Sequence, residues 1–212
     1  MAADNLLRLG EPALLCVVRH GETDWNAEGV LQGSIDVPLN DTGRRQAGEL
    51  GTLLASAGIA AVHSSSLARS RETAAIVAGR LGLSAPTLHD GLQERYFGAI
   101  EGSAKAVLAA SNPVLHRQIH LRDPAGSFAG GESMEAFAAR VLEAIHGIAA
   151  LHAGTRALVV THGWAIDVIA RAADGLAPTA ILDSKPANCE CLWLAVDDRS
   201  VRRQAPRSAD CD

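Results

Sequence analysis

The sequence lacks the features that mark several large classes of protein. No apolar run approaches the roughly 18 residues that a membrane-spanning helix needs. The opening stretch MAADNLLRLGEP lacks the basic start, apolar middle and small-residue cleavage site of a signal peptide. Aromatic residues make up only 3% of the chain, too few to favour a protein that stacks nucleic-acid bases on aromatic rings. We therefore expect a cytoplasmic protein that binds neither membranes nor nucleic acid.

Positive charge is also in deficit. The 212 residues include 19 lysines and arginines against 24 aspartates and glutamates, which gives a net charge of −5. Such a balance gives no electrostatic footprint for duplex DNA or for an anionic membrane surface. Any anion that this protein binds must therefore meet a local cluster of cations.

Cysteine is scarce, and the sequence contains neither a CxxC pair nor a disulfide framework. Cys189 and Cys191 would share one face of a strand, but nothing nearby completes a set of metal ligands. His116 and His120, four residues apart, lack a third ligand in the same way. We expect no metal and no cofactor. Four further histidines are interpreted as packed or surface residues: His63, His89, His146 and His152.

What the chain does contain is a pattern of buried strands. The runs ALLCVVR (13–19) and RALVVTHG (156–163) predict central parallel strands, because apolar residues without alternation indicate burial on both faces. Weaker runs at 59–66 and 189–196 predict two further strands. Helical patterns separate the strands, at residues 43–58, 67–82 and 133–152.

Strands that alternate with helices predict an α/β fold of three layers, with helices on both faces of a mostly parallel sheet. No linker rich in proline and glycine divides the chain, so we expect one domain over residues 1–212 with its core at about 14–196. Residues 99–131 are the least regular, and we expect them to form a lid or substrate segment. Residues 198–212 are expected to form a mobile tail.

A histidine and a glycine follow each of the two central strands. Arg19, His20 and Gly21 follow the first, and His162 and Gly163 follow the second. Ligands of open α/β sheets bind beyond the carboxyl ends of the strands, so we expect both imidazoles in one site. We expect Gly21 to let the backbone turn and a ligand approach closely.

Arg69 and Glu94 are further candidates. Arg69 lies in the first turn of a predicted helix, where its guanidinium and the helix amides can face an anion together. Glu94, taken alone, would be interpreted as part of a surface salt bridge. Arginines hold phosphate oxygens, a neutral imidazole can attack phosphorus, and a carboxyl group can protonate the leaving oxygen. Together these residue types predict a site that reacts with an anion.

RHGETDWN, followed by LQGSIDVPLNDTGRRQA, closely resembles the histidine phosphatase superfamily, whose founding members are the phosphoglycerate mutases. The resemblance continues through SSSLARSRETA, LQERYFGAIEG, GESMEAFAARV and VVTHG, over about residues 14 to 196. It implies a phosphoglycerate mutase-like fold and catalysis without a metal. It also implies that His20 is phosphorylated, with Glu94 as the proton donor and later acceptor, and that the transferred group is surrounded by Arg19, Arg69 and His162. The residues expected to bind substrate are Thr23, Asn26, Gln32, Gly33 and Gly163.

One position departs from the family pattern. Many relatives carry an arginine five residues after the second catalytic histidine, whereas HGWAID places Asp167 there. The catalytic set is untouched, but a substrate cannot be assigned from a relative that has the arginine.

Three functions are compatible with this site. We favour a phosphatase acting on a small phosphorylated metabolite over a mutase that depends on 2,3-bisphosphoglycerate. The ground is charge, because the stretch between Gly98 and Gly131 has few fixed cations: Lys105, Arg117 and Arg122. A non-catalytic regulator that binds a phospho-ligand is the third reading, disfavoured by the presence of His20 and Glu94. The sequence identifies no particular substrate, and a homo-oligomer is compatible with it.

Overall fold

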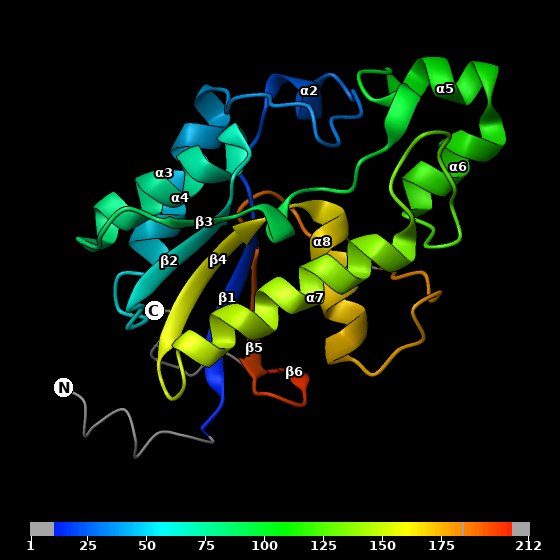
Figure 1. Ribbon diagram of the computed structural model, residues 1–212. Coiled ribbons are helices and arrows are strands. Elements are labelled where there is room, and N and C mark those ends of the chain that lie inside the picture. The colour runs from blue at the N-terminus through cyan, green and yellow to red at the C-terminus, as the bar shows by residue number, and fades with distance from the viewer. Residues whose placement is uncertain (1–10, 184, 205–212) are drawn as a thin grey trace.

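The computed structural model describes residues 11–183 and 185–204 (Figure 1). One sheet contains six strands in the order β3-β2-β4-β1-β5-β6. Neighbouring strands among the first four in this order are parallel, whereas β5 is antiparallel to both β1 and β6. The mostly parallel sheet predicted from the sequence is therefore confirmed. The strands are β1 (Ala13–Arg19), β2 (Ala61–Ser65), β3 (Thr87–His89), β4 (Arg156–Thr161), β5 (Cys191–Val196) and β6 (Val201–Arg203).

The central strands are apolar throughout because helices cover both faces of the sheet. Along β1, Leu15 and Val17 enter one hydrophobic cluster, while Cys16 and Val18 enter another on the opposite face. On one face lie α3 (Asp41–Leu53) and α4 (Ala68–Leu81), and on the other lie α7 (Met134–Leu151) and α8 (Gly163–Ala173) (Figure 1). The three-layer α/β fold is thus confirmed.

Two of the three predicted helices begin at good capping residues, whereas Leu67 at the start of α4 gives no side-chain cap. The side chain of Asn40 accepts a hydrogen bond from Gly43 N at the start of α3, and that of Ser133 accepts one from Ala136 N at the start of α7. The sequence did not predict α8. Asp167 and Arg171, four residues apart, give it one polar stripe, but both are buried together with seven of its other nine residues.

The expectation of an irregular segment at 99–131 was wrong. This stretch contains α5 (Lys105–Ser111) and α6 (Pro113–Leu121). Asn112 ends one helix and caps the next, and Pro113 occupies the first turn of α6, where its missing N–H is not needed. The two helices are too short for their apolar period to stand out in the sequence. A further short helix, α2 (Asp24–Ala27), follows β1, and single 3-10 turns lie at Asp90–Leu92 and Gly98–Ile100.

The expected mobile tail was partly wrong as well, because β6 lies within residues 198–212 and pairs with β5 through Val201 and Val196. Residues 205–212 lie outside the described part of the chain. Within that part, no helix is both long enough and apolar enough to span a bilayer.

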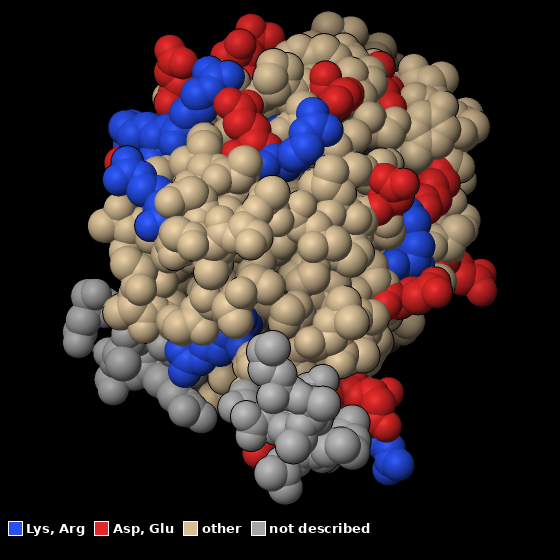
Figure 2. Space-filling view, turned by 60° about the vertical axis from the view of Figure 1, so that its left-hand side comes forward, with Lys and Arg blue, Asp and Glu red and all other residues tan. Residues whose placement is uncertain are grey.

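The outer face of α3 carries charges of both signs. Arg44 pairs with Asp41 at 3.0 Å and with Glu72 at 2.6 Å, and Arg45 pairs with Glu49 at 2.7 Å. Figure 2 shows positive and negative side chains close together on this side of the molecule, with no broad patch of one sign. Arginines and carboxylates therefore neutralise one another locally on this face.

Candidate active site

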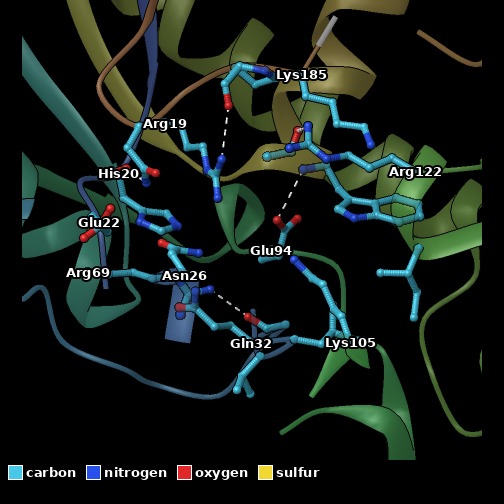
Figure 3. Close-up of a pocket in the computed structure, with 18 of the residues that line it drawn as sticks. Arg19, His20, Glu22, Asn26, Gln32, Arg69, Glu94, Lys105, Arg122 and Lys185 are labelled. Carbon is cyan, nitrogen blue, oxygen red and sulfur yellow. Dashed lines mark hydrogen bonds between the residues drawn. The ribbon is translucent and has the colours of Figure 1, made fainter. Parts of the chain in front are cut away.

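A cavity of about 490 Å³ lies at the carboxyl ends of β1 and β4. Arg19 and His20 enter it at the end of β1, and Gly163 and Trp164 enter it from the start of α8, just after β4. Arg69, from the first turn of α4, lies beside the histidine (Figure 3). The sheet thus brings the predicted residues together at the edge where ligands of such folds bind.

His20 is held as a neutral imidazole with one defined tautomer. Its Nδ1 lies 2.7 Å from the carbonyl oxygen of Gly21, and since a carbonyl can only accept, Nδ1 carries the proton. Burial, followed by the charges of Arg69 and Arg19, lowers the pKa of His20 well below its ordinary value of 6.5, and the Gly21 hydrogen bond opposes this. The lone pair of Nε2 is therefore available for attack at neutral pH.

The second histidine, His162, is also buried, and its ring centroid lies 5.2 Å from that of His20. Its Nε2 lies 2.8 Å from the hydroxyl of Ser65 and 3.3 Å from that of Ser70. Burial, followed by the charges of Arg69, His20 and Arg19, lowers the pKa of His162 well below 6.5. A neutral His162 that accepts from a serine at Nε2 carries its proton on Nδ1, which has no partner among the described residues.

Arg19 and Arg69 are anchored by their terminal nitrogens. Arg69 donates from Nη1 to Ile35 O at 2.8 Å and from Nη2 to Gly33 O at 2.7 Å, and Arg19 donates from Nη1 to Pro186 O at 3.1 Å. Burial lowers the pKa of each to about 10, so both stay charged at neutral pH. The buried Nε of each arginine has no partner within the described residues.

Glu94 lies in the cavity rather than in a surface salt bridge. Its Oε2 accepts from Trp164 N at 3.2 Å (Figure 3). Its Oε1 accepts from Arg95 N at 3.0 Å. Trp164 lies in the first turn of α8, and the side chain of the N-cap residue His162 does not cap this helix. The carboxyl group is thus fixed over the start of α8 by backbone amides.

Four of the five residues expected to bind substrate line the cavity: Asn26, Gln32, Gly33 and Gly163. The fifth, Thr23, does not line it. Its hydroxyl instead accepts a hydrogen bond from Asn26 N at 3.1 Å, and Asn26 Oδ1 accepts from Thr23 N at 3.3 Å, a capping box at the start of α2. Thr23 therefore shapes the loop that carries Asn26.

Gly21 has a different reason to lack a side chain from the one expected. A Cβ on Gly21 would lie 2.5 Å from Gly43 O, and a Cβ on Gly43 would lie 2.1 Å from Glu22 O. The backbone after β1 therefore packs directly on the start of α3, and Thr73 Oγ1 accepts a hydrogen bond from Gly21 N at 3.0 Å. The glycine serves backbone packing at this position, and no positive φ requires it.

Sequence reasoning missed several residues of the cavity. The sequence argument treats Lys105 and Arg122 as two of few fixed cations in an irregular segment, but both line the cavity, and so does Lys185, which no motif identifies. Asn188 also lines it and donates from Nδ2 to the carbonyl of His20 at 2.7 Å. No local signal could have identified Lys185 or Asn188, because more than 160 residues separate them from His20 in the chain.

No group of three or more metal-ligating side chains suited to a metal ion occurs among the residues that the structure describes. The donors that face the cavity are guanidinium, ammonium, imidazole and amide groups, which suit an anion.

The chain is similar in sequence and in fold to several known proteins. The family model of the histidine phosphatase superfamily (branch 1) matches residues 15–206. The chain is 35% identical over 187 residues, 84% of its length, to the probable phosphoglycerate mutase GpmB of Salmonella paratyphi B, of which 86% is covered. The solved structure of Bacillus stearothermophilus YhfR matches with a TM-score of 0.82 and 28% identity, over 93% of this chain and 99% of that one. A mycobacterial glucosyl-3-phosphoglycerate phosphatase matches with a TM-score of 0.79 and 26% identity, over 90% and 96% of the two chains.

Proposed function

The chain belongs to the histidine phosphatase superfamily, and we propose that it is a phosphatase that hydrolyses a small phosphate monoester through a phosphohistidine on His20. One observation carries the proposal. Around His20, the Nε of Arg19 and the Nε of Arg69 are buried N–H donors without partners among the described residues, and the Nδ1 of His162 is a third when its Nε2 accepts from Ser65. Unpaired buried donors are costly, and the three oxygens of a phosphoryl group would satisfy them.

In the first step, the Nε2 lone pair of His20 attacks phosphorus and the bond from phosphorus to the ester oxygen breaks. Arg19, Arg69 and His162 offset the negative charge that spreads over the transferred oxygens. Glu94, in its protonated form, gives its proton to the leaving oxygen, so that a neutral alcohol departs. The products of this step are phospho-His20 and the Glu94 carboxylate.

In the second step, water attacks the phosphorus of phospho-His20. The Glu94 carboxylate removes a proton from that water, the bond between nitrogen and phosphorus breaks, and inorganic phosphate leaves. His20 regains its lone pair and Glu94 its proton, so the cycle closes without a metal or a cosubstrate.

The decisive experiment is a quench of the purified protein during turnover of a radiolabelled phosphate monoester. We expect an acid-labile, base-stable label on the protein, together with phosphate release that needs no bisphosphoglycerate. Neither should occur in His20→Ala. Undiminished label in that variant would assign the nucleophile elsewhere, and the absence of any phosphate release across a panel of monoesters would overturn the proposal.

A phosphoglycerate mutase is the second candidate, because the positive charge of the cavity suits a substrate with more than one anionic group. Five lysine and arginine side chains line the cavity, against two glutamates, which is more positive charge than the sequence argument allowed for. A coupled enolase assay beside phosphate detection separates the two functions. Interconversion of 2- and 3-phosphoglycerate that depends on 2,3-bisphosphoglycerate and exceeds phosphate release would establish the mutase.

A further inference from the structure

The segment that carries Glu94 belongs to no helix or strand. It runs between two single 3-10 turns, Asp90–Leu92 and Gly98–Ile100. Glu94 lines the cavity that contains His20 and also a second, open groove of about 530 Å³. A general acid must meet the leaving oxygen at hydrogen-bond distance, and packing alone does not fix a residue that borders two open spaces. The position of Glu94 therefore depends on the hydrogen bonds of its segment.

Arg140, on α7, binds the backbone of this segment at three points. Its Nη1 donates to Gly91 O at 3.0 Å and to Gln93 O at 2.8 Å. Its Nη2 donates to the carbonyl oxygen of Glu94 itself at 3.0 Å. A Cβ on Gly91 would lie 3.0 Å from Arg140 O, so the segment also lies directly against the backbone of α7. One guanidinium thus fixes the main chain that carries Glu94.

Arg140 is itself held in one orientation. Its Nε donates to Glu132 Oε1 at 2.7 Å and its Nη2 donates to Glu132 Oε2 at 2.9 Å, which makes a bidentate ion pair. Its guanidinium carbon lies 4.8 Å from the centroid of the buried ring of Phe137. The ion pair and the three carbonyl contacts use all five N–H donors of the guanidinium. Among the side chains, arginine alone has this number of donors in one plane.

The attachment continues beyond Glu94 in the chain. Arg95 donates from Nε and from Nη2 to Glu132 O, at 3.1 Å and 3.0 Å. The residues before and after Glu94 are therefore tied to the start of α7, through Arg140 on one side and Arg95 on the other. Between these attachments, the Glu94 side chain reaches the first turn of α8, where Trp164 N donates to it at 3.2 Å.

Arg140 does not line the cavity that contains His20. Since its five N–H donors all have acceptors, it has none left for a phosphate oxygen. We propose that Arg140 is a positioning residue for the proposed proton donor, because it fixes where the carboxyl group of Glu94 meets the leaving oxygen. The inference rests on the proposed function, which takes Glu94 as the group that protonates that oxygen.

The test takes the ratio of kcat/KM for an alkyl phosphate to kcat/KM for p-nitrophenyl phosphate. An alkyl oxygen needs a proton to leave and p-nitrophenolate does not, so this ratio reports the action of Glu94 as an acid. Arg140→Gln should lower the ratio by about tenfold to a hundredfold, since a misplacement of about 1 Å can cost a hundredfold in rate. The value for p-nitrophenyl phosphate should change little. A merely structural role would lower both values together and leave the ratio unchanged.

A double-mutant cycle shows whether Arg140 acts through Glu94. Glu94→Gln alone should lower the ratio. Glu94→Gln combined with Arg140→Gln should lower it no further, because no acid remains to be positioned. Losses that multiply in the double variant would overturn the proposal.

Arg140→Lys separates position from charge. The lysine keeps the positive charge but has three donors and no planar fork, so we expect the ratio to stay well below that of the wild type. A wild-type ratio in this variant would show that the charge matters and the hydrogen bonds to the carbonyl groups do not, which would overturn the proposal.

Arg156→Gln is the matched control. Arg156 also donates to a backbone carbonyl, Ala57 O at 2.6 Å, but it lies at the start of β4, at the opposite end of that strand from His162. This variant should leave the ratio unchanged even where it lowers the melting temperature, which is measured for every variant. Where Arg140→Gln does not fold, Glu132→Gln replaces it, because it removes the ion pair that orients Arg140 and should lower the ratio by a smaller factor.

A wild-type ratio in a folded Arg140→Gln, or in Glu132→Gln in its place, would overturn the positioning role and leave the proposed function standing. Absence of hydrolysis of both substrates by the wild-type protein would instead overturn the proposed function.

Discussion

His20 and His162 lie just beyond the ends of adjacent parallel strands, with their ring centroids 5.2 Å apart and their planes inclined by 59°. The register that pairs Arg19 with Thr161 brings the two histidines to the same level of the sheet. Their partners differ, because His20 donates to a carbonyl while His162 meets serine hydroxyls. The first ring therefore presents the lone pair of Nε2 to the cavity, whereas His162 lies behind the residues that line the cavity and holds a proton on Nδ1 when its Nε2 accepts from Ser65.

From this difference we predict that the two histidines respond differently to removal. His20→Ala should abolish both turnover and covalent label, because it removes the Nε2 lone pair that attacks phosphorus in the proposed first step. His162→Ala should lower kcat by about a hundredfold to a thousandfold, the usual effect of losing one donor to the transition state, while label still forms. Single-turnover quench experiments measure both quantities. Loss of label in His162→Ala with kcat unchanged would contradict these roles.

Glu94→Gln should slow hydrolysis according to the leaving group. A general acid contributes about a hundredfold to ten-thousandfold when the leaving oxygen is basic, so alkyl phosphates should lose that much and p-nitrophenyl phosphate far less. Glu22→Gln is the control, because Glu22 also lines the cavity but hydrogen-bonds to Asn40 Nδ2 at 3.0 Å. It should affect both substrates alike. Equal losses in Glu94→Gln would remove it as the proton donor.

Three histidines that contact one another outside the cavity predict that the free energy of unfolding decreases at acid pH. His63 lies with Nδ1 2.9 Å from His89 Nε2 and with Nε2 2.7 Å from His152 Nε2. Burial, with the neighbouring His152 and His89, lowers the pKa of His63 to about 4 from 6.5. As the pH falls below 6.5, His63 therefore gains a proton in the unfolded chain before it does so in the folded protein. The free energy of unfolding consequently decreases as the pH falls from 6.5 to about 4.

Urea unfolding of the wild type and His63→Gln at several pH values isolates this contribution. The comparison is needed because burial raises the pKa of Asp167 to about 6, which changes stability in the opposite direction over part of the same range. We expect the wild type to exceed the variant by more at pH 7 than at pH 5. A difference that is constant with pH would mean that His63 binds a proton equally well in the folded state.

Asp167→Asn should destabilise the protein by roughly 3 kcal/mol, because removing one partner of a buried ion pair leaves the other charge uncompensated. The side chains of Arg122 and Asp167 are only 11% and 3% exposed. Asp41→Asn is the matched control, since its pair with Arg44 has side chains that are 103% and 46% exposed, and we expect no measurable change there. Urea unfolding at pH 7.5 measures both variants. Equal stability of the two would show that Asp167 does not hold Arg122.

The sequence predicted the sheet and the reacting group because both depend on short stretches of chain. An apolar run predicts a buried strand wherever it occurs, and β1 occupies Ala13–Arg19, the range predicted for it. Parallel strands end at one edge of a sheet, so a histidine after each of two strands was enough to place His20 and His162 together. The motif around His20 and the position of Glu94 followed from resemblance to the family.

The tertiary structure alone decided what surrounds that group. Gly21 is required by the backbone of Gly43, and Thr23 caps a helix instead of lining the cavity. Lys105 and Lys185 meet because the α5–α6 region and the loop before β5 fold over the same edge of the sheet. Periodicity reports only the neighbours of a residue along one element, whereas convergence of charges from distant segments depends on how the whole chain packs. The sequence therefore determined which strands end in His20 and His162, and the packing of distant segments decided that Lys105 and Lys185 line the same cavity as His20.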